Sequence, residues 1–152
     1  MYQVAPSLLR KHALAAQDIQ AADLLRQLQA DMERGLDVAV AIGDDAHSDP
    51  AEGPQLAMRL AALLREPLGR AAGLIVTGGE TARAVLQTLG IHRLHVHTQS
   101  EPGVVISVSE ASRPQWIATK AGAFGQASSL HRAGQAIRSL QAGDQTYSTK
   151  ES

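Results

Sequence analysis

A short apolar segment that runs straight into two glycines is the feature that most constrains how this chain can fold. Residues 74–77, Leu-Ile-Val-Thr, lack the alternation of polar and apolar side chains that marks a half-exposed strand. Such a run predicts a strand covered on both faces, as in a parallel sheet with helices on each side. Gly78 and Gly79 follow at once, and residues 82–89 favour a helix that closes at Gly90. The sequence therefore predicts a strand–turn–helix unit of an α/β domain.

Helices and strands alternate through the first two-thirds of the chain. The other predicted elements are, in chain order, a helix at 18–35 that Asp18 caps and Gly35 ends, a strand at 37–42, a helix from about 55 to 64, strands at 92–97, 104–108 and 115–119, and a helix at 127–140. This order predicts an α/β fold, a layered α/β/α domain with a largely parallel (mixed) sheet. We expect residues 1–17 to form a lead-in segment, residues 18–140 one folded domain, and residues 141–152 a flexible tail.

Composition and charge exclude several classes of protein. The chain has 152 residues, of which 44% are hydrophobic, so it can bury a sizeable core. Its net charge is -1 and its Lys and Arg residues are scattered, which offers no basic surface to nucleic acid or anionic lipid. The absence of cysteine excludes disulfides, thiolate metal sites and a thiol nucleophile. With no signal-peptide pattern and no apolar run near about 18 residues, we expect a cytoplasmic protein without a nucleic-acid or membrane partner.

The turn from Gly78 to Thr81 has the composition of an anion-binding site. Glycine lets the backbone approach a ligand closely, and the start of a helix presents unpaired N–H groups at the positive end of its dipole. Phosphate is the natural occupant, and the Thr81 hydroxyl can donate to it or cap the helix. Glu80 can hold Mg²⁺ or a ribose hydroxyl, or simply interact with the helix N-terminus. Because glycine pairs also end strands in α/β proteins that bind nothing, a structural role stays open.

A second glycine-spaced turn follows the strand predicted at 115–119. Lys120 lies at the end of that strand, and its ammonium group can neutralise a phosphate while Gly122 and Gly125 admit backbone contacts. The alternative for Lys120 is an ordinary solvated charge, and Phe124 is expected to anchor the turn in the core. The carboxyl ends of parallel strands converge on one crevice, where α/β proteins bind ligands. The two turns together therefore predict one phosphate site.

Two further polar clusters suggest a metal site only weakly. His95 and His97 share one face of a predicted strand, but no third ligand is paired with them. The aspartates in the loop 44–49 lack a recognised cation-binding spacing. We predict no metal site formed by protein ligands alone.

Three motifs, in this order, resemble those of the four-carbon acid sugar kinases, the family of D-threonate, D-erythronate and 3-oxo-tetronate kinases. They are Gly78-Gly79-Glu80-Thr81, Glu101-Pro102-Gly103-Val104 and Lys120-Ala121-Gly122-Ala123-Phe124-Gly125. The resemblance covers roughly residues 31–140 and corresponds to the C-terminal nucleotide-binding domain of that family. The first and third motifs together are fairly specific, whereas Pro-Gly alone is not.

The resemblance implies an α/β domain that binds an adenine nucleotide, with ATP and Mg²⁺ as cofactors. Residues 18–140 would form this domain. The residues that it places around the nucleotide are Gly78, Gly79, Glu80 and Thr81 at the phosphates, Pro102 and Gly103 nearby, Gly122, Ala123 and Gly125 completing the pocket, and Lys120 at its edge.

Family members also have an N-terminal domain that binds the sugar acid and supplies the catalytic base. This sequence has no counterpart of that domain, and Asp44 and Asp45 follow a different strand from the one that precedes the family's Asp-rich loop. We therefore expect the ATP-binding part of a kinase for a four-carbon sugar acid, inactive as an isolated chain, with its catalytic residues elsewhere. The alternative is a non-catalytic module that binds another phosphorylated ligand or assembles with another subunit. Which sugar acid is used, and whether the chain forms a homo-oligomer, stay open.

Overall fold

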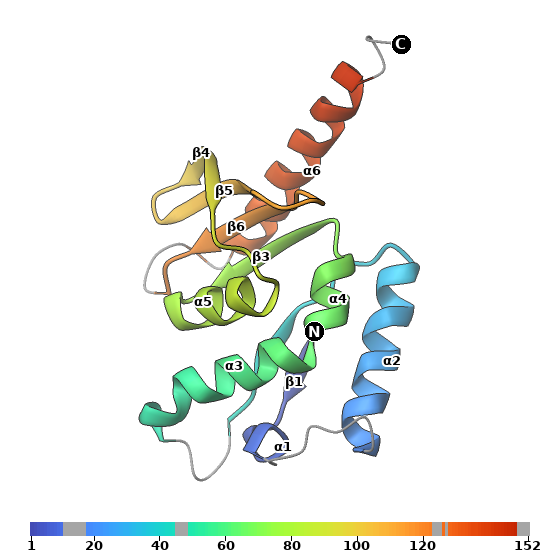
Figure 1. The fold of residues 1–152 in the computed structure, drawn as a ribbon, viewed down its shortest axis with the longest axis vertical. Helices are drawn as coiled ribbons and strands as arrows, with labels where there is room; N and C mark the ends of the chain where they lie inside the picture. Colours follow the sequence, from blue (N-terminus) through green and yellow to red (C-terminus); the bar gives the residue numbers. More distant parts are fainter. Residues whose placement is uncertain (11–17, 45–48, 123–125, 127, 149–152) are drawn as a thin grey trace. The chain divides into compact units, whose positions relative to one another are not determined.

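The computed structural model describes residues 1–10, 18–44, 49–122, 126 and 128–148 (Figure 1). The chain divides into two compact units, Met1–Ala71 and Ala72–Ser152. Each unit has its own sheet, one of two strands in the order β1-β2 and one of four strands in the order β3-β6-β5-β4. The predicted α/β class with a mixed sheet is confirmed.

In the described part of the first unit, four α-helices pack around a small parallel sheet. Its elements are β1 (Tyr2–Val4), α1 (Pro6–Arg10), α2 (Ile19–Glu33), β2 (Val40–Ile42), one turn of 3-10 helix (Pro50–Glu52), α3 (Gly53–Leu63) and α4 (Arg65–Arg70). The core is aliphatic and consists of Val4, Leu8, Leu9, Leu28, Leu56, Leu60 and Leu64. The sequence predicts no element before residue 18, yet β1 and α1 contribute three of these buried side chains. The start of the chain is therefore part of the folded unit.

Helix α2 begins and ends where the sequence predicts. The Asp18 carboxylate accepts hydrogen bonds from two backbone N–H groups of the first turn, at 3.0 and 3.4 Å. Gly35 follows the helix with a φ of +74°, as expected for the residue that ends a helix in the left-handed conformation. Between these ends Leu28 is buried, whereas Ile19 is 76% exposed. The apolar face is thus narrower than the residue spacing indicates.

The second unit contains the predicted strand–turn–helix unit. Its elements are β3 (Gly73–Thr77), α5 (Gly79–Thr88), β4 (Leu94–Glu101), β5 (Val104–Ser109), β6 (Trp116–Lys120) and α6 (Ser129–Ser148). β3 and β6 are parallel, whereas the β6–β5 and β5–β4 pairs are antiparallel. The antiparallel share is larger than the alternation of helices and strands indicates, because the Pro102–Gly103 turn joins β4 to β5 as a hairpin without a crossover.

Helices α5 and α6 cover opposite faces of the four-stranded sheet (Figure 1). Leu74 and Val76 of β3 are buried on one face. On the other face, the side chain of Ile75 approaches Gly134 of α6. The core on the α6 side consists of Val104, Ile106, Ala118, Ala133 and Ile137. Ile75 is nevertheless 38% exposed, so β3 is buried on one face and only partly covered by α6 on the other. The prediction of a strand buried on both faces is wrong on the α6 side, because α6 leaves part of the Ile75 side chain in contact with solvent.

Helix α6 continues to Ser148, although the sequence indicates a polar tail after Leu140. The Gln141 side chain donates a hydrogen bond to the carbonyl of Ala72 at 2.7 Å, which fixes the helix against the start of β3 beyond its last core residue. Neither α6 nor any other helix in the described part of the chain is long and apolar enough to span a bilayer.

We expect Gly73→Ala to destabilise the second unit by about 1 kcal/mol, because overpacking a filled site forces neighbouring side chains to move. A Cβ atom at this position would lie 2.8 Å from the Cγ2 methyl of Ile137. The matched control is Gly134→Ala on α6, where the new atom would make an ordinary contact of 3.6 Å with Ile75. Urea denaturation compares the two variants, and a Gly73→Ala protein as stable as the wild type would contradict the close packing of β3 on α6.

Candidate functional site

The first and second glycine turns meet at the carboxyl ends of β3 and β6. These strands are parallel neighbours, and Thr77 is paired with Lys120 where both strands end. The backbone N–H of Gly78 donates to the carbonyl of Lys120 at 2.9 Å. A Cβ atom on Gly122 would lie 3.9 Å from the Cα of Gly78. Two motifs about forty residues apart in the sequence are thus in direct contact.

The Pro102–Gly103 turn joins the same edge of the sheet. Gly103 has a φ of +80°, and its carbonyl accepts a hydrogen bond from the backbone N–H of Ala121 at 2.9 Å. Val104, the first residue of β5, is paired with Lys120. The structure therefore brings the described parts of all three motifs together, through backbone hydrogen bonds from Gly78 to Lys120 and from Ala121 to Gly103.

The start of α5 presents unpaired backbone donors at this edge. Gly78 is the N-cap residue, and no described side chain caps the helix. The first three N–H groups of the helix belong to Gly79, Glu80 and Thr81, and a helix makes no internal partner for them. Gly79 is exposed and its Cβ position has no atom within 4 Å. The arrangement offers backbone N–H groups and a positive helix end to an anion that approaches from solvent.

Two charged side chains flank this helix start. The Lys120 ammonium donates to the carbonyls of Ala121 and Gly122, at 3.1 and 3.3 Å, so it lies over its own turn. The Glu80 carboxylate lies 3.7 Å from the Arg83 guanidinium, and both side chains are more than half exposed. An incoming anion would meet the lysine as the nearest positive charge of the second turn, while Glu80 supplies a solvent-accessible carboxylate.

Glu101, which ends β4, forms an ion pair that sequence reasoning missed. Its Oε2 atom accepts hydrogen bonds from Nε and Nη2 of Arg132, the former at 2.9 Å. Its Oε1 atom is buried and has no hydrogen bond of normal geometry among the described residues. The nearby Ser129 side chain, followed by the Arg132 guanidinium, favours the carboxylate and holds the pKa of Glu101 below its ordinary value. A lowered pKa keeps Glu101 ionised at neutral pH, and the pair is lost only as the pH falls through that lowered value.

Two of the candidate residues, Ala123 and Gly125, lie outside the described residues, as does Phe124. Pro102 is exposed beside Gly103. The eight described candidates, Pro102 among them, belong to the three turns described above.

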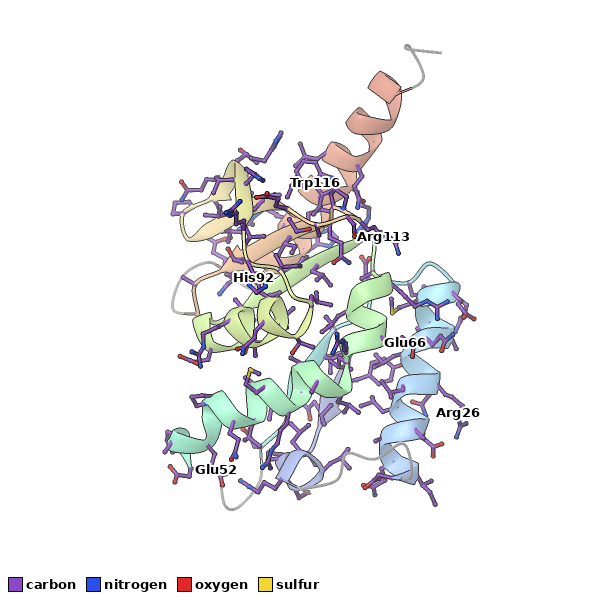
Figure 2. All side chains as sticks on the ribbon, viewed as in Figure 1. Arg26, Glu52, Glu66, His92, Arg113 and Trp116 are labelled. Atoms are coloured by element: carbon purple, nitrogen blue, oxygen red, sulfur yellow. The ribbon has the colours of Figure 1, made fainter. Side chains whose placement is uncertain are left out.

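His95 and His97 of β4 contact protein side chains, and in the described residues neither belongs to a group that could hold a metal ion. His95 lies 3.4 Å from the Glu110 carboxylate. His97 packs edge-on against Trp116, labelled in Figure 2, with ring centroids 5.0 Å apart. Over the described ranges of the chain, no group of three or more His, Cys, Asp or Glu side chains is placed to hold a metal ion.

A shallow hollow in the first unit, of about 190 Å³, is remote in sequence from all three motifs. It lies between α2 and α4 and contains an exposed ion pair of 3.4 Å between Arg70 and Glu66, the latter labelled in Figure 2. Its other lining residues are Leu25, Gln29, Met32, Glu33 and Pro67. It has no glycine turn and no unpaired helix start, so the edge of the four-stranded sheet remains the candidate site.

Comparison with known proteins gives one family for nearly the whole chain. The sequence model of the family described as "Nucleotide-binding C-terminal domain" matches residues 3–130. A D-threonate kinase of Cupriavidus necator is 44% identical over 109 residues, which cover 70% of this chain and 26% of that protein. A 3-oxo-tetronate kinase of Pseudomonas savastanoi pv. phaseolicola is 45% identical over 51 residues, which cover 34% of this chain and 12% of that protein. The chain thus spans about a quarter of the first relative's length.

Solved structures include a protein of similar fold. A crystal structure of a domain of unknown function from Bordetella bronchiseptica, a domain-swapped dimer with bound citrate, is 28% identical to this chain. The alignment has a TM-score of 0.64 and covers 90% of this chain and 35% of that one. The similarity therefore extends over both units of the chain.

Proposed function

Because this chain belongs to the family of nucleotide-binding C-terminal domains, we propose that it binds ATP at the edge of its four-stranded sheet and serves a kinase that phosphorylates a four-carbon sugar acid. The observation that carries the proposal is the contact between the turns at Gly78, Gly103 and Gly122, beside the uncapped start of α5. Glycines, backbone N–H groups and a lysine are the groups that hold phosphates in proteins.

We assign the phosphate contacts to the backbone at the start of α5. The N–H groups of Gly79, Glu80 and Thr81 would donate to phosphate oxygens, with Lys120 moving from its turn carbonyls to the added negative charge. Mg²⁺ prefers oxygen ligands and binds through one or two carboxylates together with nucleotide phosphates. Glu80 is the exposed carboxylate of the first turn, so it fits this role. Pro102, Gly103, Gly122, Ala123 and Gly125 would form the rest of the pocket.

The sugar acid and the catalytic base are assigned to a separate domain. Phosphoryl transfer depends mainly on positioning the two substrates and neutralising phosphate charge. The three turns supply the second requirement and hold the nucleotide. The D-threonate kinase is about four times as long as the segment it shares with this chain, so its remaining length has room for an acceptor domain. We propose that such a domain or subunit is the partner of this chain, and that they act in the cytoplasm, where ATP is available.

Calorimetric titration of the chain with Mg-ATP, Mg-ADP and Mg-GTP tests nucleotide binding directly. We expect saturable binding of both adenine nucleotides, because the phosphate-binding groups all lie within the second unit. No binding at millimolar nucleotide would contradict the proposal. That result would favour a second function, an assembly module, for which the supporting observation is that the related Bordetella structure is a domain-swapped dimer.

A further inference from the structure

We propose that Glu101 is a positioning residue, whose ion pair with Arg132 holds the backbone of Gln126, at the far end of the second glycine turn, in the place that nucleotide binding requires. This inference rests on the proposed function and adds to it a residue that contacts neither phosphate nor acceptor. The described residues on which the inference rests are Ala121 and Gln126, at the two ends of that turn.

The ion pair connects two elements that the chain brings together from a distance. Glu101 and Arg132 are 31 residues apart, and their side chains meet between the end of β4 and the first turn of α6. The Glu101 side chain is only 16% exposed, whereas that of Arg132 is 43% exposed. Arg132 also donates to the hydroxyl of Ser128, just before the helix begins. The carboxylate therefore fixes a guanidinium group that itself fixes the start of α6.

Two backbone N–H groups of this turn, those of Ala121 and Gln126, are hydrogen-bonded to residues close to Glu101 or to its ion pair. At its beginning, the N–H of Ala121 donates to the carbonyl of Gly103, two residues after Glu101. At its end, the N–H of Gln126 donates to the Ser129 hydroxyl at 2.7 Å, and Ser129 is only 1% exposed. Because Ser129 is the first residue of α6, the position of the helix start sets the position of this second attachment.

Helix α6 does not depend on the ion pair to remain on the sheet. Ala133 and Ile137 are 1% and 4% exposed, and they pack against the strands of the same core. Loss of the ion pair should therefore free the first turn of α6 and the preceding attachment while the rest of the helix stays in place. For this reason we assign the main effect of the ion pair to the geometry of the site.

The test compares Glu101→Gln, Arg132→Gln and the double variant with a matched control. Glutamine keeps the size of the glutamate side chain and removes its charge. The control is Glu52→Gln, which breaks the 2.7 Å ion pair with Arg10 in the first unit. Two quantities are measured in each protein: amide hydrogen exchange without nucleotide, resolved by NMR at Ala121 and Gln126, and the affinity for Mg-ATP by calorimetry.

We expect faster exchange at Ala121 and Gln126 and about tenfold weaker Mg-ATP binding in both single variants, with no further loss in the double variant because the two residues act as one pair. The thermal midpoint should fall slightly in these variants, because the lowered pKa of Glu101 means that the ionised pair also stabilises the fold. The control should match the wild type in both exchange and affinity. Unchanged exchange at Ala121 and Gln126, or losses of affinity that add in the double variant, would overturn the inference. A wild-type chain that binds no nucleotide would instead overturn the proposed function, and the exchange rates would still decide whether the ion pair holds the turn.

Discussion

Replacing Gly79 with leucine should weaken the binding of Mg-ATP by about 100-fold, because the loss of two hydrogen bonds to charged phosphate, at about 1.5 kcal/mol each, has an effect of that size. The leucine side chain would stand over the N–H groups at the start of α5, where phosphate oxygens must approach closely. The fold should not change, because the Cβ position of Gly79 has no atom within 4 Å and Gly79 is not among the glycines with positive φ. Calorimetry measures the affinity, and thermal denaturation followed by circular dichroism measures stability.

The matched control for this variant is Gly53→Leu. Gly53 is also the first residue of a helix, α3, is also exposed, and also has no atom within 4 Å of its Cβ position. The control should therefore share any general effect of leucine at a helix start and leave nucleotide affinity unchanged. Equal affinity for Mg-ATP in the Gly79 variant and the wild type would remove the start of α5 from the binding site.

Local patterns were sufficient to predict the elements that carry the site. The apolar run before Gly78 predicts a strand, and β3 is that strand, although only alternate side chains of it are buried. Asp18 and Gly35 mark the ends of α2 through backbone groups within a few residues of each. These predictions succeed because the physical cause lies within one turn of helix or a single strand.

Strand β1 and the first residues of α5, which were not predicted, depend on partners far along the chain. β1 has only three residues, and its pairing partner β2 lies about forty residues later, so no local periodicity indicates it. Helix α5 begins at Gly79 although glycine disfavours helix. The N–H group of Gly78 donates to the carbonyl of Lys120, and the carbonyl of Gly78 accepts the first hydrogen bond of that helix. Tertiary context thus overrides the local preference at the position that matters most for the site.

The candidate site was predicted from its glycines and not from its supporting side chains. A glycine turn after a buried strand has a recognisable pattern, and strand order then places two such turns together. Arg132 has no such pattern, because one arginine in an amphipathic helix resembles any solvated charge. Its contact with Glu101 follows from the antiparallel hairpin at Pro102–Gly103, which the alternation of elements did not indicate. Only the three-dimensional structure could connect the two.

Replacing Gly78 with alanine should reduce both the stability of the second unit and its affinity for nucleotide. Gly78 has a φ of +88° and a ψ of 136°, a conformation that costs a residue with a side chain on the order of 1–3 kcal/mol. Crowding is not the cause, because the nearest atom to its Cβ position is the Thr81 hydroxyl oxygen at 3.9 Å. Relief of this strain would rotate the N–H groups of the first turn of α5 away from the phosphates. Urea denaturation and calorimetric titration measure the two effects.

Gly122→Ala is the control that separates backbone strain from the loss of a glycine at this edge of the sheet. Gly122 is not among the described glycines with positive φ, and its added Cβ atom would make an ordinary contact of 3.9 Å with Gly78. Its stability should therefore match that of the wild type. If Gly78→Ala were equally stable, the left-handed backbone at the start of α5 would be contradicted. A loss of stability in the Gly78 variant alone, together with a loss of Mg-ATP affinity in the Gly79 variant, would show that the site needs glycine for two separate reasons. These reasons are backbone conformation at Gly78 and close approach of a ligand at Gly79.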